Sequence, residues 1–307
     1  MKDYYAENAM KTMAAYCTEE GIVIVEDLAQ NQIIYKIDIF GDRYKYLQYE
    51  WDITPYFSFS PDGKWLVITY GMGYIYFVEL ASGIIREKIR LFKEVDYSTA
   101  SFEDIDTCCY YNIYTRIDFS TSGRYMAARV RGDFDPQDSD GRTLMFEPIY
   151  FRSAFVFDME TRKMIFYYSY PEEEKYKARS LGTIAFSPDD KLLVTGVFGG
   201  PVKVFELISG KESASFEMLE WVSAPRDIDN RKLVAFLNDK EFVFVNKERE
   251  LVWAISDETG SWDVKTKIAA KELVAFGNNI FDIEYDRAQK SISCYGGRKD
   301  EGCVIAL

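Results

Sequence analysis

The sequence predicts an all-β protein built from six similar repeats, each with four antiparallel strands. Three observations support this prediction: an apolar anchor residue recurs at long spacings, strand-like runs follow every anchor, and hairpin turn motifs separate the runs. The chain has 307 residues, enough for two ordinary domains, although closed all-β folds often reach this length as one domain. We expect a single domain over residues 1–307.

The anchor is a Leu or Met that follows the first turn of each repeat. It is Leu66 in "FSPDGKWLV" and Leu193 in "FSPDDKLLV", two closely similar stretches that lie 127 residues apart. The six anchors in chain order are Met13, Leu66, Met126, Leu193, Leu233 and Leu273. Their successive spacings are 53, 60, 67, 40 and 40 residues. The longer spacings therefore indicate insertions into a shorter basic repeat.

Each anchor is followed by runs that alternate between apolar and polar residues and are rich in β-branched and aromatic side chains, which is typical of strands. The first set of runs is "IVIVED", "YIYFVE", "AFVFDM", "VKVFEL", "EFVFVN" and "IFDIEY". A short polar turn leads to a second set: "IIYKIDIF", "IIREKIRL", "KMIFYYSY", "ESASFEML", "ELVWAISD" and "KSISCYG". We assign these sets to strands c and d, the anchor to strand b, and the run before the turn, such as "YFSFS", to strand a.

The turn between strands a and b is readable from its residue types. In "SPDG", Pro61 presets the backbone of the first corner, Asp62 accepts local amide hydrogen bonds, and Gly63 tolerates the exit geometry. We interpret this motif as a structural hairpin device in every repeat.

Four-stranded repeats arranged in series are the building blocks of a β-propeller, in which radial closure protects the sheet edges. The stretches "FSPDGKWL", "YIYFVELASG" and "FSPDDKLLVTG", "VKVFELISGK" also resemble blades of WD-repeat propellers, with "FVEL" or "VFEL" where that family ends strand c in V-W-D. The six repeats predict six blades, and seven, the commonest number in the family that the chain resembles, is the alternative. The resemblance also implies a ring latched by pairing of the N- and C-terminal segments, with "GCVIAL" pairing with the first repeat and "DYYAE" as the competing candidate for that innermost position.

The chain has no histidine, and this absence removes whole classes of chemistry. The buried His network of WD-repeat blades cannot form, so we expect packing to hold the blades rigid. Ser-His-Asp and Cys-His nucleophile systems and His-ligated metal sites each need an imidazole. We identify no catalytic residue, metal site or cofactor site. The Asp-rich stretch 133–143 lacks EF-hand spacing, and a solvated hairpin tip is favoured there over a cation site.

Charge and hydropathy also limit the partners. Lys and Arg total 37 against 50 Asp and Glu, which gives a net charge of −13, so phosphate backbones are repelled on average and no nucleic-acid partner is expected. No apolar run approaches the roughly 18 residues of a membrane helix, and no signal-peptide pattern begins the chain. We expect a soluble cytoplasmic protein with no membrane partner and with reduced cysteines. A redox pair at Cys108 and Cys109 is the alternative for those two residues.

The insertions fall at 41–53, 93–113 and 131–152. The first two lie between strand d of one repeat and strand a of the next, and the third lies between strands b and c. In an up-and-down sheet these connections leave from the same end, so we expect all of them on one face. Their net charges are −1, −4 and −2, and the segment 171–180 that leads into the fourth repeat adds 0, so these segments hold −7 of the −13 charges.

Loops on a rigid scaffold often carry binding residues, and aromatic side chains among carboxylates are typical of a protein-binding patch that attracts a basic partner. The predicted partner-binding residues are Tyr44, Tyr46, Trp51, Tyr97, Phe102, Asp104, Asp106, Tyr110, Tyr111, Phe134, Asp135, Asp138 and Asp140.

The predicted function is a non-catalytic protein–protein interaction scaffold that presents this acidic, aromatic loop face to a partner protein. One alternative is a propeller hydrolase or lyase that uses carboxylates and a divalent cation in the central channel. Another is an acidic inhibitor or immunity-type protein that binds a basic toxin. A subunit of a larger complex with no separable activity is also compatible with the sequence.

Overall fold

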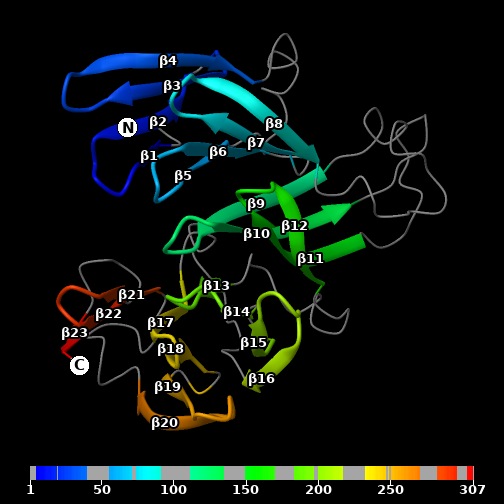
Figure 1. Ribbon diagram of the computed structural model, residues 1–307, viewed down its shortest axis with the longest axis vertical. Coiled ribbons are helices and arrows are strands. Elements are labelled where there is room, and N and C mark those ends of the chain that lie inside the picture. Colours follow the sequence, from blue (N-terminus) through cyan, green and yellow to red (C-terminus); the bar gives the residue numbers. More distant parts are fainter. Residues whose placement is uncertain are drawn as a thin grey trace. The chain divides into compact units, whose positions relative to one another are not determined.

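The computed structural model in Figure 1 describes residues 5–18, 20–39, 55–70, 74–90, 111–134, 149–169, 183–196, 200–216, 232–246, 248, 250–269, 282–295 and 303–306. The regular elements in these ranges are β-strands, and they form six antiparallel sheets. The predictions of an all-β fold and of six repeats are therefore confirmed.

The strands follow one another in chain order within every sheet. The first two sheets contain β1 (Tyr5–Glu7), β2 (Met13–Cys17), β3 (Ile22–Asp27), β4 (Gln32–Asp38), β5 (Tyr56–Phe59), β6 (Trp65–Tyr70), β7 (Tyr74–Glu79) and β8 (Ile84–Arg90). The third and fourth contain β9 (Tyr111–Phe119), β10 (Tyr125–Phe134), β11 (Ile149–Asp158), β12 (Lys163–Ser169), β13 (Thr183–Phe186), β14 (Leu192–Gly196), β15 (Val202–Glu206) and β16 (Glu212–Phe216). The fifth and sixth contain β17 (Val234–Asn238), β18 (Glu241–Val245), β19 (Glu250–Ser256), β20 (Trp262–Ala269), β21 (Asp282–Asp286), β22 (Ser291–Tyr295) and β23 (Cys303–Ala306).

The chain divides into two compact units. The first comprises Met1–Phe119 and Val130–Arg152, and the second comprises Ser120–Arg129 and Ser153–Leu307. The first unit holds the first two sheets and β9, and the second holds β12 and the last three sheets, while β10 and β11 contribute to both. The single domain expected over residues 1–307 stays a prediction.

The alternating pattern of the strands places apolar side chains in the core of each unit. In the first unit, Val23 and Val25 of β3 are buried in one cluster with Leu66 and Ile68 of β6. Each pair is spaced by two residues, as expected for side chains on one face of a strand. Burial of each such side chain contributes about 1.5–3 kcal/mol, so packing between neighbouring sheets contributes to the stability of the unit.

In the second unit, two apolar clusters hold the sheets together. One joins the third and fourth sheets, where the rings of Phe166 on β12 and Phe205 on β15 lie 5.2 Å apart. The other extends over the last three sheets and includes the fully buried Phe242 of β18 and the buried Cys294 of β22. Aromatic pairs at such distances add to the energy of area burial alone.

One backbone hydrogen bond recurs in the first five sheets. A residue at the end of the third strand, either its last residue (Ser256) or the one directly after it, donates its N–H to the carbonyl oxygen of the residue before the second strand, at 2.8 Å in every case. The donor and acceptor pairs are Leu28 and Thr12, Leu80 and Lys64, Met159 and Arg124, Leu207 and Lys191, and Ser256 and Lys240. This repetition shows that the five sheets share one construction.

The assignment of strands in the last two repeats was wrong by one position. Leu233 does not lie on a second strand but directly precedes β17, the first strand of the fifth sheet, and its N–H donates to Thr183 Oγ1 at 3.1 Å. "EFVFVN" and "ELVWAISD" therefore form the second and third strands, and β20 is the fourth. In the sixth sheet, "IFDIEY" and "KSISCYG" likewise provide the first and second strands. Alternation identifies a strand but not its place in the sheet, because all four positions have similar patterns.

We expected the C-terminal run to pair with the first repeat, but in the described sheets it pairs with the strand that precedes it in the sequence. The C-terminal run forms β23, which pairs with β22 in a three-stranded sixth sheet, and β1 from the competing "DYYAE" segment pairs with β2 as the first strand of the first sheet. Pairing with a strand nearby in the sequence closes a short loop, which costs less chain entropy than closing a loop of the whole chain.

Candidate interaction surface

Most of the predicted partner-binding residues lie outside the described residues. These are Tyr44, Tyr46, Trp51, Tyr97, Phe102, Asp104, Asp106, Tyr110, Asp135, Asp138 and Asp140. The main chain is described for the other two: Tyr111 is the first residue of β9, and Phe134 is the last residue of β10. The grouping of these residues into one binding site stays a prediction.

Two of the three insertions are shorter than expected, because strands extend into them. β9 begins at Tyr111, inside the segment 93–113, and β10 and β11 occupy both ends of the segment 131–152. β10 and β11 have ten residues each. In the longer β10–β11 ladder, main-chain N–H and C=O groups bond to each other. In a loop, the same groups would form hydrogen bonds with water.

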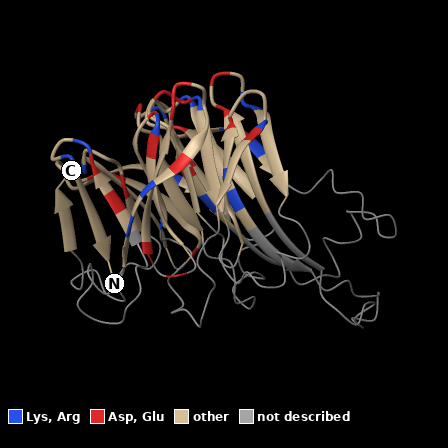
Figure 2. Cartoon of the chain, turned by 90° about the horizontal axis from the view of Figure 1, so that it is seen from below, with Lys and Arg blue, Asp and Glu red and all other residues tan. Residues whose placement is uncertain are grey.

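The strand order determines where the insertions leave each sheet. Consecutive antiparallel strands reverse direction, so the end of a second or fourth strand lies at the same end of the sheet as the start of a first or third strand. The connections β4–β5, β8–β9 and β10–β11 therefore leave from what we call the insertion end of their sheets. The short turns after first and third strands occupy the opposite end, the turn end, where Figure 2 shows acidic and basic residues interspersed.

At the turn end, the carboxylates of the first turns are held by neighbours in the same turn. Ser60 Oγ accepts a hydrogen bond from the N–H of Trp65 at 2.9 Å and donates one to Asp62 Oδ1 at 2.6 Å. Lys64 Nζ pairs with Asp62 Oδ2 at 3.0 Å. Partial burial alone would raise the pKa of Asp62, but the hydrogen bonds from Ser60 and Lys64 outweigh it and lower that pKa. The main-chain N–H of Lys64 also donates to Asp62 Oδ1 at 3.1 Å, so the predicted role of Asp62 as an acceptor of local amide hydrogen bonds is confirmed.

The fourth sheet repeats this arrangement. Ser187 Oγ accepts from the N–H of Leu192 at 2.9 Å and donates to Asp189 Oδ1 at 2.8 Å. Lys191 Nζ lies 2.8 Å from Asp189 Oδ2. The similar sequences of the two repeats therefore form the same turn, in which a Lys side chain pairs with the Asp carboxylate.

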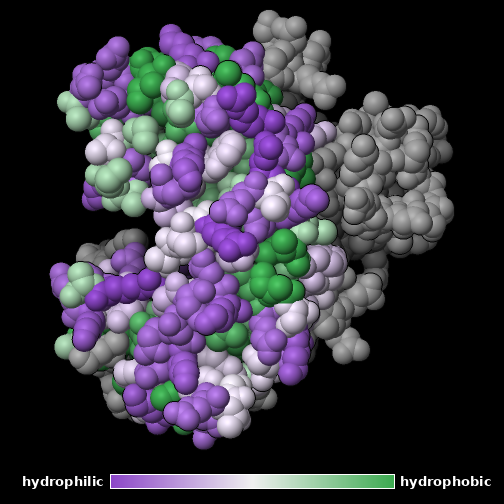
Figure 3. Space-filling model, in the orientation of Figure 1, coloured by the Kyte–Doolittle hydropathy of each residue, from purple (hydrophilic) through white to green (hydrophobic). Residues whose placement is uncertain are grey.

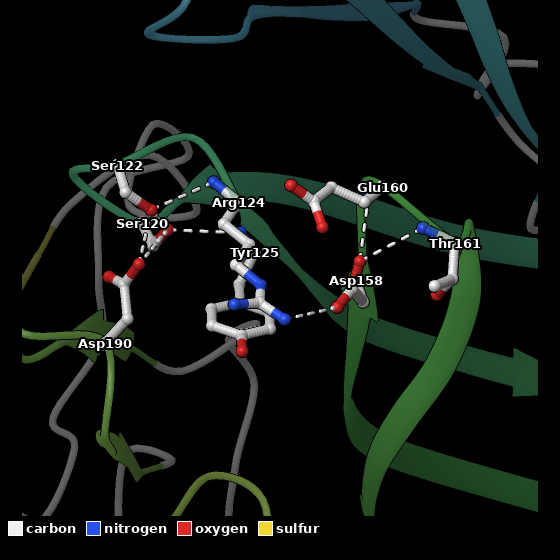
Figure 4. Close-up of polar contacts among 8 residues, drawn as sticks. All are labelled: Ser120, Ser122, Arg124, Tyr125, Asp158, Glu160, Thr161 and Asp190. Atoms are coloured by element: carbon white, nitrogen blue, oxygen red, sulfur yellow. Dashed lines mark hydrogen bonds and ion pairs between the residues drawn. The ribbon is translucent and has the colours of Figure 1, made fainter.

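The turns after the third strands hold their acidic side chains in a similar way. Glu79 accepts from Ser82 Oγ at 2.6 Å and pairs with Arg86, and the hydrogen bond from Ser82 and then that from Arg86 lower the pKa of Glu79. Asp158 accepts from the N–H groups of Glu160 and Thr161 at 2.9 and 3.1 Å, as Figure 4 shows. The carboxylates of Glu79 and Asp158 therefore stabilise their own turns.

A second set of hydrogen bonds joins neighbouring sheets, and the sequence analysis missed it. Asp190 accepts from Ser120 Oγ at 3.3 Å and from Ser122 Oγ, which links the fourth sheet to the third (Figure 4). Asp239 Oδ1 accepts from the N–H of Asp189 at 2.8 Å, which links the fifth sheet to the fourth. Hydrogen bonds therefore join neighbouring sheets in addition to apolar packing, whereas we expected packing to hold the blades rigid.

One signal in the sequence points to this contact. Asp190 adopts φ 61°, in the left-handed region, and it occupies the place that Gly63 has in "SPDG", where φ is 70°. A non-glycine residue is uncommon in that region. Asp190 in place of the glycine is therefore a departure that the sequence shows between the two turns. Here the carboxylate of Asp190 reaches the adjacent turn.

In the first unit, polar groups are buried between the second and third sheets. Arg116 and Asp118 of β9 are 9% and 8% exposed, and the Arg116 guanidinium carbon lies 2.9 Å from the ring centroid of Tyr56 on β5. Thr69 Oγ1 donates to the carbonyl oxygen of Thr115 at 2.9 Å. Alternation alone did not predict this polar layer, because it requires knowing which strands are neighbours.

One face of the described surface is mainly polar. In the view of Figure 3, hydrophilic side chains predominate, with separate hydrophobic groups among them. The exposed large apolar side chains include Met10, Ile33, Ile84, Ile208 and Val304. Among the described residues there is no group of three or more His, Cys, Asp or Glu side chains arranged to hold a metal ion. No helix in the described ranges has the length and apolar character required to cross a membrane.

Comparison with known proteins identifies the fold. No protein-family model and no curated protein matches the sequence. The structure is similar to the Cps50 (Swd1) β-propeller domain of Myceliophteria thermophila, with a TM-score of 0.52 and 10% sequence identity over 99% of this chain and 85% of that one. The dihydro-heme d1 dehydrogenase NirN in complex with DHE matches with a TM-score of 0.48 and 12% identity over 94% of this chain and 50% of that one. The six antiparallel sheets and the first of these matches show that the chain has a β-propeller fold.

Proposed function

We propose that this β-propeller is a non-catalytic interaction scaffold whose insertion segments bind another protein. The observation that carries the proposal is the uneven distribution of charge. The segments 41–53, 93–113 and 131–152 hold −7 of the −13 net charges, whereas acidic residues at the turn end, such as Asp62 and Asp189, are paired with Lys64 and Lys191. The segments that leave the insertion ends therefore hold about half of the net negative charge of the chain.

The proposed partner is a basic protein. A net negative charge on these segments would attract positive charge over about a Debye length, roughly 8 Å at physiological salt, and raise association rates. The aromatic residues of the same segments would supply the apolar contact area that holds the complex together. We therefore expect binding that weakens as salt concentration rises.

A charge-matched pair of variants tests the proposal. In the first variant, Asp104, Asp106 and Asp138 of the insertion segments are changed to Asn. In the control, Glu160, Glu258 and Asp263, which lie in turns or on β20, are changed to Gln, Gln and Asn. Both variants lose three negative charges. A change in binding that depends only on the net charge of the protein should therefore be the same in both.

The measurement is quantitative mass spectrometry of proteins that co-purify with each variant from native lysate. We expect recovery of basic partners to fall for the insertion variant and to stay at the wild-type level for the control. Equal recovery from all three proteins would contradict the proposal. A stoichiometric divalent cation in the purified protein, with turnover of a lactone or phosphoester, would favour the hydrolase or lyase alternative instead.

A further inference from the structure

Two cysteines face each other across the last two strands. Cys294 on β22 and Cys303 on β23 are direct partners in the antiparallel register, and both are free thiols. Cys294 is completely buried in the apolar cluster of the last three sheets, and Cys303 packs against the same cluster from a partly buried position. Their side chains therefore share one face of the sheet.

This placement suits a disulfide bond. Opposed residues of antiparallel strands have Cα atoms about 4.5 or 5.5 Å apart, and disulfides span Cα separations of about 4.4–6.8 Å. Their Cβ atoms stand about 4.5–5.5 Å apart, so closure requires an approach of about 1 Å. β23 pairs only with β22 in the described sheet and can therefore shift by that amount more easily than a central strand.

The two thiols differ in reactivity. Burial, and to a smaller degree the neighbouring Cys303, raises the pKa of Cys294 to about 12. Burial also raises the pKa of Cys303, but a hydrogen bond from the Cys294 thiol opposes this effect. Because the thiolate is the nucleophile in disulfide exchange, Cys303 is the residue that reacts first, and it does so slowly at neutral pH.

We propose that Cys294 and Cys303 are a redox-sensitive pair that a small-molecule disulfide such as oxidised glutathione converts into a cross-strand disulfide. The Cys303 thiolate attacks one glutathione sulfur and displaces the other glutathione as a thiolate. Cys294, losing its proton, then attacks the Cys303 sulfur of the mixed disulfide and displaces the second glutathione. The two protein thiols are oxidised, and one oxidised glutathione becomes two reduced molecules.

The consequence is a change in how firmly β23 is held. In the reduced protein the described pairing of β23 rests on its ladder with β22, and Val304 at its centre is 68% exposed. Short strands at a sheet edge open readily. A covalent bond to β22 would restrict that opening, so the oxidation state would set the mobility of this edge.

Mass spectrometry of the folded protein after incubation in glutathione buffers tests the proposal. Unreacted thiols are alkylated, and trypsin cleaves after Lys290, Arg298 and Lys299, so the two cysteines fall in the separate peptides 291–298 and 300–307. We expect a disulfide-linked pair of these peptides under oxidising conditions and a loss of two alkylatable thiols. Hydrogen exchange of residues 304–306 should slow in the oxidised protein.

Cys17 provides the matched control. It is a free, partly buried thiol on β2, burial raises its pKa to about 11, and its partner on β3 is Val23. Cys17→Ser should leave the linked peptides unchanged, and Cys303→Ser should abolish them; Cys294→Ala should do the same if it folds. The proposal is overturned if the folded wild type yields no linked peptides, or yields them only in denaturant. It is likewise overturned if Cys17 and Cys303 form mixed disulfides to the same extent without a linked product.

Discussion

The ring of Tyr35 occupies the space that a Cβ atom on Gly83 would require. A Cβ built on Gly83 would lie 2.6 Å from Tyr35 Cγ, and Gly83 also adopts φ 68°. The fourth strand of the first sheet therefore packs directly against the main chain of a turn in the second sheet. In the equivalent "ELISG" turn, a Cβ atom built on Gly210 would lie 3.9 Å from Phe166 Cδ2 of the preceding sheet.

Gly83→Ala should therefore destabilise the protein strongly. The new methyl group would both overlap the Tyr35 ring and hold an unfavourable φ, so we expect a loss of about 2–4 kcal/mol in the free energy of unfolding. Gly63→Ala is the control, because Gly63 has φ 70° and no heavy atom within 4 Å of an added Cβ; it should cost only about 1–2 kcal/mol. Urea denaturation measures both. Equal losses would show that the Tyr35 contact is unimportant.

Asp190 should stabilise the contact between the third and fourth sheets. Asp190→Gly keeps the left-handed backbone, relieves its strain and removes the hydrogen bonds from Ser120 and Ser122. We expect a net loss of about 1–2 kcal/mol, since bonds to a charged group are worth more than neutral ones. A double-mutant cycle with Ser122→Ala should give a coupling energy of about 0.5–3 kcal/mol. Strictly additive effects would contradict the proposed contact.

Stability should depend on pH in the acid range. Hydrogen bonds from Ser60 and Lys64, and from Lys191 and Ser187, outweigh burial and lower the pKa values of Asp62 and Asp189 below their ordinary 3.8. Their stabilising contribution is therefore present above the unfolded value and is lost as pH falls through the folded values. We expect the free energy of unfolding to fall below about pH 5 and to change little between pH 6 and 8, because the chain has no histidine.

Thermal unfolding across pH measures this dependence. The double variant Asp62→Asn, Asp189→Asn should show a shallower decline in acid than the wild type. An unchanged profile would mean that these two turns do not contribute to acid sensitivity.

The ring of Tyr56 should be needed for its contact with Arg116. The guanidinium carbon lies over that ring and Arg116 is buried, where a cation–π contact is worth about 2 kcal/mol. Tyr56→Leu should therefore lower the free energy of unfolding by about that amount, while Tyr56→Phe, which keeps the ring, should cost clearly less. Chemical denaturation separates the two, and equal losses would indicate a role for the Tyr56 hydroxyl instead.

Local features of the sequence determined much of this protein. Turn residues such as Asp62 and Gly63 specify hairpins through contacts within a few positions, and alternation specifies strands, so the all-β fold and the six repeats could be predicted. The candidate binding residues followed from spacing and charge and stay a prediction, and the strands β9, β10 and β11 extend into two of the three predicted insertions.

Only the tertiary structure decided which strands became neighbours. It placed Leu233 before a first strand, paired β23 with β22, brought the Asp190 carboxylate to Ser122, and set Cys294 opposite Cys303. The physical reason is that a local pattern records a side chain's preference for burial or solvent. The partner that a strand edge or a buried polar group meets depends instead on the packing and chain entropy of the whole sheet.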